Sequence, residues 1–239
     1  MLLQCETDFA DAGWLREDTL ASLRELNEEC LELCAAQARA QPGNATLAEI
    51  ARHWNSLDVA ARARASGCLY LLVDAGFAEP ERWRRRAVRQ VDDAGQGYAP
   101  FFSIAASAAV AQGVLTFAWY LARCQGAAAR LLLGMPAACV AELAHHTLGE
   151  VRALAVRNPH WLKPRWAQRP AMWREFLAAA AAEDAARLER ARLRGQRLLA
   201  AETRSASASR ELPRPLAAEC PPTRGRACLR SDSAEPVRF

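Results

Sequence analysis

Apolar residues in the first part of the chain recur at spacings of three and four, which places them on one face of an α-helix. Leu20, Leu23, Leu26 or Asn27, Cys30 and Leu33 follow this spacing after Asp18, a residue type common at helix N-termini. We therefore predict a first helix that ends before Pro42. The polar face of this helix is acidic and carries Glu25, Glu28, Glu29 and Glu32.

The next segments carry their own start signals. Thr46 and Glu49 form a capping box, in which each side chain bonds a free backbone N–H at the start of a helix. Residues 69–73, Leu-Tyr-Leu-Leu-Val, have strand propensity, but no partner strand is visible nearby in the sequence. We therefore predict a buried helix from about Asp58 toward Leu72, followed by a turn over residues 74–77 and a short helix at Pro80.

The second half of the chain is typical of a series of shorter helices. A glycine-containing loop over residues 93–100 precedes an alanine-rich helix that begins near Phe102. Short helices then end at Gly134, run from Pro136 to about residue 144, and begin at a second capping box formed by Thr147 and Glu150. Further helices are predicted from Pro170 and over residues 183–202, the latter rich in arginine. Beyond Thr203, serines and prolines end the helical pattern.

The amino-acid composition also favours a helical fold. Alanine, the best helix former, is the most frequent residue, whereas Gly and Pro number only 12 each and aromatic residues make up 7% of the 239 residues. This composition excludes an all-β fold. We predict an all-α multi-helix bundle with an N-terminal helical unit (1–92), a loop (93–100), a C-terminal helical unit with a short helix-turn-helix-like segment (101–203) and a disordered tail (204–239).

Charge is distributed unevenly along the chain. The net charge is +4, and Lys163 is the one lysine among 31 basic residues. Residues 1–50 have a net charge of −7, whereas residues 151–200 have a net charge of +7. This asymmetry predicts either an anionic partner for the second half or docking between the two halves.

Eight cysteines are present, and no two of them form a Cys-x-x-Cys motif. Cys30 and Cys34 lie one helical turn apart and could supply two ligands to a metal, but a second ligand pair is missing. We therefore expect reduced cysteines, no metal and no cofactor. Residues 1–9 contain acids and no apolar stretch, and residues 104–122 are interrupted by polar residues, so we expect a cytoplasmic protein with no membrane partner.

The common catalytic signatures are absent from the sequence. It contains no Gly-x-Gly-x-x-Gly, no phosphate-binding loop, no Gly-x-Ser-x-Gly and no His-Glu-x-x-His. His145 and His146 are interpreted as a polar turn between two helices. Asp74 is either a catalytic carboxylate or, as we expect, a residue that closes a helix C-terminus. We therefore do not predict an enzyme.

Two segments have features of nucleic-acid binding. The run Arg82-Trp-Arg-Arg-Arg86, with Arg89, offers guanidinium groups for phosphates and an indole for stacking, or else forms a solvated face with Trp83 in the core. Residues 137–157 have the outline of a helix-turn-helix. Its second helix offers few side chains that could read bases, so this segment predicts phosphate contacts at most.

Residues 115–166 resemble a known family. They contain Leu115-Thr-Phe-Ala-Trp-Tyr-Leu-Ala-Arg123, Arg130-Leu-Leu-Leu-Gly-Met135, Leu143-Ala-His-His-Thr-Leu-Gly-Glu-Val151, Leu154-Ala155 and Leu162-Lys-Pro-Arg-Trp166. This order resembles FlhD, the D subunit of the bacterial flagellar master transcription regulator. Glu150 stands where that family usually has Gln, and Pro164 and Trp166 replace an apolar residue and Phe.

The resemblance implies an all-α dimerising subunit that works with a second subunit on promoter DNA. It places helix packing or dimer contacts on Leu121, Leu132, Gly134, Leu143 and Leu148. Gly134 would supply a tight turn between helices.

We therefore expect a transcription-regulator-like protein that acts on DNA as a homodimer or with a partner subunit. The predicted phosphate contacts are Arg152, Arg157, Arg165, Arg169, Arg190 and Arg194. The alternative is a non-enzymatic helical adaptor that binds a basic partner through its acidic first helix and does not bind DNA.

Overall fold

The computed structural model describes residues 15–41, 45–84 and 100–211. Within these ranges most residues are helical and the strands are two residues long each, so the predicted all-α class is confirmed. The elements are α1 (Glu17–Ala40), α2 (Ala45–Asn55), α3 (Val59–Ser66), β1 (Val73–Asp74), α4 (Pro80–Trp83), α6 (Ile104–Cys124), α7 (Gly126–Leu133), α8 (Ala137–Ala144), α9 (Leu148–Arg157), the 3-10 helix η1 (Pro159–Trp161), β2 (Lys163–Pro164), α10 (Pro170–Ala181) and α11 (Ala185–Glu211).

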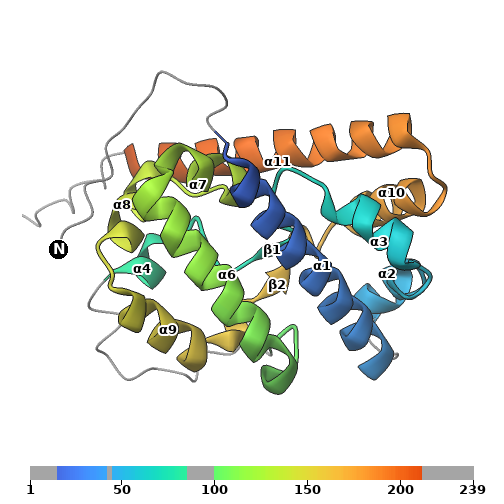
Figure 1. The fold of residues 1–239 in the computed structure, drawn as a ribbon, viewed down its shortest axis with the longest axis horizontal. Helices are drawn as coiled ribbons and strands as arrows, with labels where there is room; N and C mark the ends of the chain where they lie inside the picture. Colours follow the sequence, from blue (N-terminus) through green and yellow to red (C-terminus); the bar gives the residue numbers. More distant parts are fainter. Residues whose placement is uncertain (1–14, 42–44, 85–99, 212–239) are drawn as a thin grey trace, which may run out of the picture.

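Helices α1 and α6 lie side by side in the middle of the molecule (Figure 1). Helices α2 and α3 pack on α1, and α10 covers α2 and α3, whereas α7, α8 and α9 surround α6. Helix α11 runs across the top of the view and packs on α10 and α7. Helices from both sides of residue 93 therefore share one core, while residues 93–99 of the predicted loop lie outside the described residues.

Helix α1 contributes both apolar and polar contacts to this core. Leu23, Cys30 and Cys34 are buried at the predicted helical spacing. Asn27 is fully buried on the same face, where its Nδ2 donates to the carbonyls of Ser66 and Tyr70 over 3.1 and 3.0 Å. Its Oδ1 accepts the backbone N–H of Leu72 over 2.8 Å. One helical side chain thus satisfies backbone groups at the end of α3 and in the loop that follows it.

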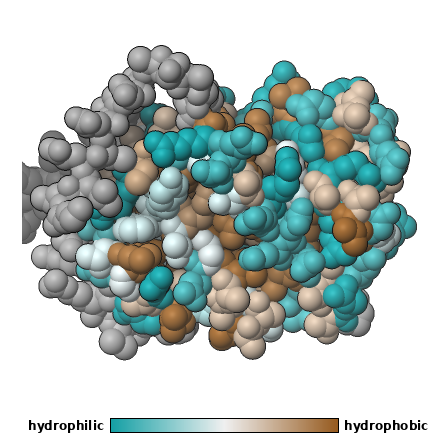
Figure 2. All heavy atoms as spheres, viewed as in Figure 1, coloured by the Kyte–Doolittle hydropathy of each residue, from teal (hydrophilic) through white to brown (hydrophobic). Residues whose placement is uncertain are grey.

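Helix α6 is the one helix in the described part of the chain that is long and apolar enough to cross a membrane. Its face carrying Val114, Leu115 and Leu121 is buried against neighbouring helices. This packing is typical of a core helix. On the face of the molecule in Figure 2, hydrophobic side chains show between hydrophilic ones.

The predicted turns between α7, α8 and α9 are confirmed. Gly134 ends α7 in the left-handed conformation, with φ of 70°, and its N–H bonds the Arg130 carbonyl over 3.1 Å. Pro136 caps α8, and Thr147 and Glu150 form the capping box at the start of α9. These signals are local in sequence, and the structure follows them.

Two predicted helix boundaries are wrong. The helix expected to continue toward Leu72 ends at Ser66, and residues 73–74 form β1, which pairs with β2 (Lys163–Pro164) in an antiparallel bridge. The partner strand lies far away in the sequence, which is why local inspection missed it. The last helix continues past Thr203 to Glu211, so the predicted tail begins later than 204, and residues 212–239 lie outside the description.

Candidate functional site

The six arginines predicted to contact phosphate do not form one surface. Arg152 and Arg157 are exposed on α9, where the Nε of Arg157 donates to the Ala153 carbonyl over 3.1 Å. Arg190 and Arg194 are exposed on α11. Because α9 and α11 lie at opposite edges of the view in Figure 1, the two pairs cannot contact one short stretch of DNA together.

Arg165 is a buried residue, and its prediction as a phosphate contact on the protein surface is wrong. Only 5% of the residue is exposed. Its Nε donates to the carbonyl of Leu71 and its Nη2 to the carbonyl of Leu133, each over 2.6 Å. Its guanidinium also lies 5.7 Å from the centre of the Phe77 ring. Arg165 therefore joins three parts of the backbone inside the fold.

A row of five arginines follows the outer face of α11. We call this row, formed by Arg187, Arg190, Arg194, Arg197 and Arg204, the arginine stripe. Its members are exposed and recur at intervals of three, four, three and seven residues, so they share one side of the helix. At 1.5 Å per residue the stripe is about 25 Å long. Sequence reasoning named two of its members and missed three, although helical spacing alone could have found them.

The opposite face of α11 fixes the direction of the arginine stripe. Leu188, Ala191 and Leu199 are buried on that face. Gly195 approaches Tyr70 so closely that a Cβ on it would overlap the phenol oxygen. Arg192, on the flank, donates to the Arg64 carbonyl over 2.6 Å. The helix therefore cannot rotate about its axis, and the stripe faces solvent.

The arginine stripe has few internal ion pairs. Arg194 pairs with Glu175 on α10 over 2.8 Å. The other four guanidinium groups have no ion-pair partner among the described residues. Unpaired guanidinium groups in a row are available to an anionic partner.

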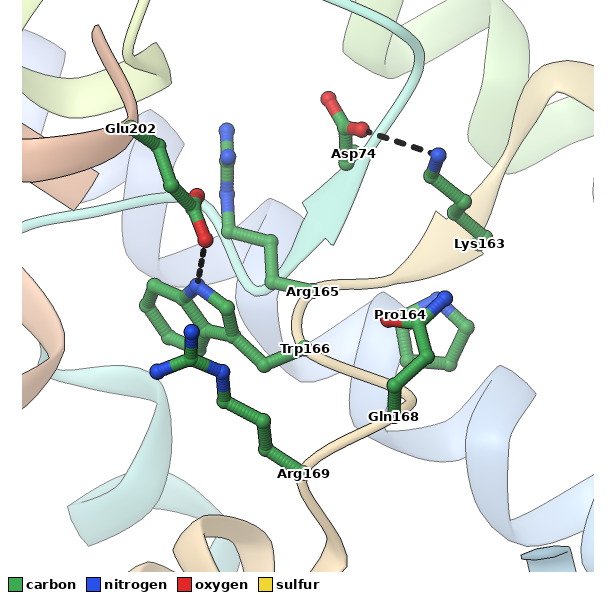
Figure 3. A pocket seen from close by; sticks show the side chains of 8 residues that line it. All are labelled: Asp74, Lys163, Pro164, Arg165, Trp166, Gln168, Arg169 and Glu202. Carbon is green, nitrogen blue, oxygen red and sulfur yellow. Dashed lines mark hydrogen bonds and ion pairs between the residues drawn. The ribbon is translucent and has the colours of Figure 1, made fainter. Parts of the chain in front are cut away.

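A charged cavity of about 410 Å³ lies beside α11 (Figure 3). Its wall combines the β1–β2 bridge, the loop between β2 and α10, and one residue of α11. The lining residues are Asp74, Lys163, Pro164, Arg165, Trp166, Gln168, Arg169 and Glu202. We call this space the bridge cavity. It contains the sixth predicted arginine, Arg169, which is exposed.

Asp74 is an ionised carboxylate in the wall of the bridge cavity. Burial acts to raise its pKa, but the charges of Arg165 and Lys163 and the N–H of Phe77 together hold the pKa below its ordinary value. Its Oδ1 accepts the N–H groups of Gly76 and Phe77, and its Oδ2 lies 3.5 Å from the Lys163 Nζ. Asp74 closes a turn rather than a helix C-terminus, which corrects the predicted structural role.

The Arg82–Arg86 run is anchored in the core by its tryptophan. Trp83 is fully buried and stacks on Phe77 with ring centres 6.0 Å apart. Arg82 pairs with Glu79 and Arg84 with Glu81, each over 2.7 Å. This arrangement is the solvated face with a core tryptophan, not a stacking platform. Residues 85, 86 and 89 lie outside the described part of the chain.

The histidine pair divides between surface and core. His145 is exposed, whereas His146 is fully buried and its Nε2 donates to the Trp83 carbonyl over 2.7 Å. The carbonyl of His146 accepts the Trp119 indole N–H over 2.8 Å. His146 thus joins α4 to the α8–α9 turn, and the interpretation of the pair as a polar surface turn holds for His145 alone.

The residues predicted for packing or dimer contact lie mostly inside the chain. Leu121, Leu132 and Leu143 are fully buried, so they pack helices within one subunit. Gly134 forms the turn described above. Leu148 is half-buried at the start of α9 and is the member of this set that a second subunit could reach.

The cysteines and the acidic helix complete the candidate groups. Cys30, Cys34 and Cys68 are buried free thiols, and burial raises the pKa of each, to about 12 for Cys68. The described residues contain no group of three or more His, Cys, Asp or Glu placed to hold a metal ion. Glu25, Glu29 and Glu32 are exposed on α1, and Glu32 pairs with Arg62 over 2.9 Å.

Comparison with protein-family models, with curated proteins and with solved structures finds no match to this chain.

Proposed function

We propose that the protein binds duplex DNA through the arginine stripe of α11 and acts in transcription regulation. The observation that carries this proposal is the row of outward-facing guanidinium groups, four of which have no internal ion pair among the described residues. Guanidinium groups bond phosphate oxygens in a planar fork, and neutralised phosphates release counterions. The resemblance of residues 115–166 to FlhD supports a regulatory role with a partner subunit or as a homodimer.

The chemistry of the stripe favours phosphate contact over base reading. The exposed residues between its arginines are Leu193, Ala200 and Ala201, which are apolar or small, and the acidic Glu189 and Glu202. Side chains that distinguish bases are chiefly Asn, Gln, Ser, Thr and suitably placed Arg. We therefore expect binding that depends strongly on salt and weakly on base sequence, with promoter choice supplied by a second subunit.

The test is fluorescence anisotropy with a labelled 30-base-pair duplex at several KCl concentrations. We compare the full chain with a stripe variant, Arg190→Glu, Arg197→Glu and Arg204→Glu. A control variant, Arg24→Glu, Arg52→Glu and Arg130→Glu, changes the net charge equally at exposed positions of α1, α2 and α7. Circular dichroism of each variant confirms that it is folded.

We expect the stripe variant to bind at least tenfold more weakly and the control to change affinity less than about threefold. The slope of log affinity against log salt becomes shallower by about 3 when three phosphate contacts are lost. Equal affinity loss in the two variants would mean that net charge, not the stripe, attracts DNA. A further variant, Arg152→Glu and Arg157→Glu, tests the predicted contacts on α9.

The adaptor function has one observation in its favour. Glu25 and Glu29 are exposed on the outer face of α1 and have no ion-pair partner among the described residues. A basic partner segment fits this surface. Deleting α1 would remove core residues such as Leu23, so the appropriate test is Glu25→Lys with Glu29→Lys. Loss of a nuclease-resistant partner in a pull-down, with DNA binding intact, would favour the adaptor.

A further inference from the structure

The bridge cavity is assembled from segments that are distant in sequence. Asp74 comes from β1, Lys163 from β2, Arg169 from the turn before α10, and Glu202 from α11. Figure 3 shows these side chains arranged around one space, with the Trp166 indole between Arg169 and Glu202. Its volume of about 410 Å³ falls within the range of small-molecule sites.

Some polar groups of the cavity already have hydrogen-bond partners within the fold, whereas others do not. Asp74 accepts two backbone N–H groups and lies beside Lys163. Arg165 uses Nε and Nη2 on backbone carbonyls. The side chains of Arg169 and Gln168, in contrast, have no hydrogen-bond partner among the described residues. The cavity therefore presents unused donors on the side of the α10 turn.

One carboxylate of the cavity retains an unused oxygen. Glu202 accepts the Trp166 indole N–H on Oε1 over 2.8 Å. Its Oε2 has no partner among the described residues. The cavity thus offers free donors on the Arg169 side and a free anionic acceptor on the α11 side, with an aromatic ring between them.

The loop that carries these groups is held in a strained conformation. Trp166 has φ of 51°, in the left-handed region that bulky residues avoid. The Trp166 ring meets Tyr70 edge to face with ring centres 5.5 Å apart, and the Trp173 indole donates to the Arg165 carbonyl over 2.7 Å. Strain that surrounding contacts maintain is typical of ligand sites, because it fixes side chains before the ligand arrives.

From this arrangement we infer that the bridge cavity binds a small zwitterion of the amino-acid class. Its phosphate or carboxylate group lies at Arg169 and Gln168, with Lys163 adding charge, and its ammonium group lies at Glu202. A guanidinium matches either oxyanion in a two-point contact. The lining carries three cations and two carboxylates, so a ligand with groups of both signs matches it better than a simple anion.

The experiment uses isothermal titration calorimetry on the full chain. The probes are O-phosphoserine, 3-phosphoglycerate and inorganic phosphate. The first two molecules differ only in an ammonium group against a hydroxyl group, so their comparison isolates the contact with Glu202. The variants are Arg169→Gln and Glu202→Gln, with Arg197→Gln as a control on the outer face of α11.

We expect O-phosphoserine to bind at least fivefold more tightly than 3-phosphoglycerate in the unmodified chain. Glu202→Gln removes this difference while keeping an amide oxygen for the Trp166 N–H. Arg169→Gln weakens both organic probes at least tenfold, and Arg197→Gln leaves them unchanged.

Three results would overturn the inference: equal affinity for the two organic probes, equal weakening by Arg197→Gln, or no saturable binding of any probe at 10 mM, the highest concentration applied. The proposal does not depend on DNA binding. The two functions are independent if the stripe variant loses DNA binding, measured by anisotropy, but keeps ligand binding, measured by calorimetry. The reverse result would separate them in the same way.

Discussion

The guanidinium of Arg165 donates a hydrogen bond to the backbone carbonyl of Leu133 over 2.6 Å, inside the fold. The sequence predicts a surface position for Arg165, as a phosphate contact, and places Leu133 at the end of a helix. A second bond from the same side chain reaches the Leu71 carbonyl. Burial acts to lower the pKa of Arg165, and the charges of Asp74 and Glu202 oppose that shift, so the group stays a cation.

Replacing Arg165 tests this structural role. We expect Arg165→Met to lower the free energy of unfolding by about 3 kcal/mol, because two buried carbonyls lose their donor and Asp74 loses a counter-charge. Urea unfolding followed by circular dichroism measures the change. Arg152→Met, at an exposed position, should change stability by less than about 0.5 kcal/mol. We expect the DNA affinity of the folded Arg165→Met variant to stay within threefold of that of the original chain. A tenfold loss of affinity would instead mean that Arg165 contacts DNA phosphates.

Asp74 makes stability depend on pH in the acidic range. Its pKa is held below the ordinary value in the folded state, so it stabilises the fold above the unfolded-state pKa of about 3.9. That contribution disappears as pH falls through the lower folded-state value. We expect Asp74→Asn to cost about 2 kcal/mol at pH 7, and the gap between the two proteins to close below about pH 4.

Urea unfolding at intervals from pH 7 to pH 3 checks this prediction. Asp58→Asn serves as the control, because Asp58 accepts the Ala61 N–H at a helix N-cap and asparagine caps equally well. A gap between Asp74→Asn and the original chain that stays constant down to pH 3 would contradict the role assigned to Asp74.

Helices and turns were predictable because their signals are local. The capping box at Thr147 and the left-handed turn at Gly134 each depend on residues within four positions, and both form as expected. The β1–β2 bridge was not predictable in this way, because Asp74 pairs with Lys163 from another part of the chain. Apolar periodicity also contains no information about which distant backbone an extended segment such as residues 69–73 will meet.

The two candidate sites also differ in whether local sequence signals could predict them. The arginine stripe depends on helical spacing within α11, so counting from Arg187 to Arg204 in steps of three and four would have completed it. The bridge cavity depends on side chains from four separate elements, and its tryptophan adopts a backbone conformation that no local signal predicts. Arg165 and Arg169 are four residues apart, yet only tertiary packing places one in the core and the other on the surface.

Asn27 is expected to be the most sensitive polar residue of the core. Asn27→Ala leaves the Leu72 N–H and the carbonyls of Ser66 and Tyr70 without their partner, so we expect a loss of about 4 kcal/mol. Asn27→Asp keeps the size but places an oxygen against two carbonyls, and should destabilise at least as much. Thermal and urea unfolding measure both variants.

Asn55→Ala is the matched control for this prediction. Asn55 is exposed and accepts one bond from Arg39 over 3.1 Å, so its loss should change stability by less than about 0.5 kcal/mol. Similar unfolding free energies for Asn27→Ala and Asn55→Ala would show that the loop over residues 66–72 does not depend on α1.

Helix α11 approaches Tyr70 so closely at Gly195 that a side chain there would overlap the Tyr70 ring. A comparison with another helical glycine tests the cost of adding one. A Cβ at Gly149 meets only the Thr147 Oγ1, at 3.9 Å, so Gly149→Ala should stabilise by up to about 1 kcal/mol through helix propensity. The same substitution at Gly195 gains that propensity but forces α11 away from Tyr70. We expect a net loss of about 1–2 kcal/mol for Gly195→Ala, because overpacking exceeds the propensity gain.

A double-mutant cycle with Tyr70→Phe identifies the cause of that loss. The Tyr70 hydroxyl is buried without a hydrogen-bond partner among the described residues, so removing it alone should be neutral or slightly stabilising. In the Gly195→Ala background the same change removes the atom nearest the new methyl group and should recover part of the lost stability. A coupling energy of zero between the two substitutions would mean that Gly195→Ala acts elsewhere, and that α11 is not held in register by its contact with Tyr70.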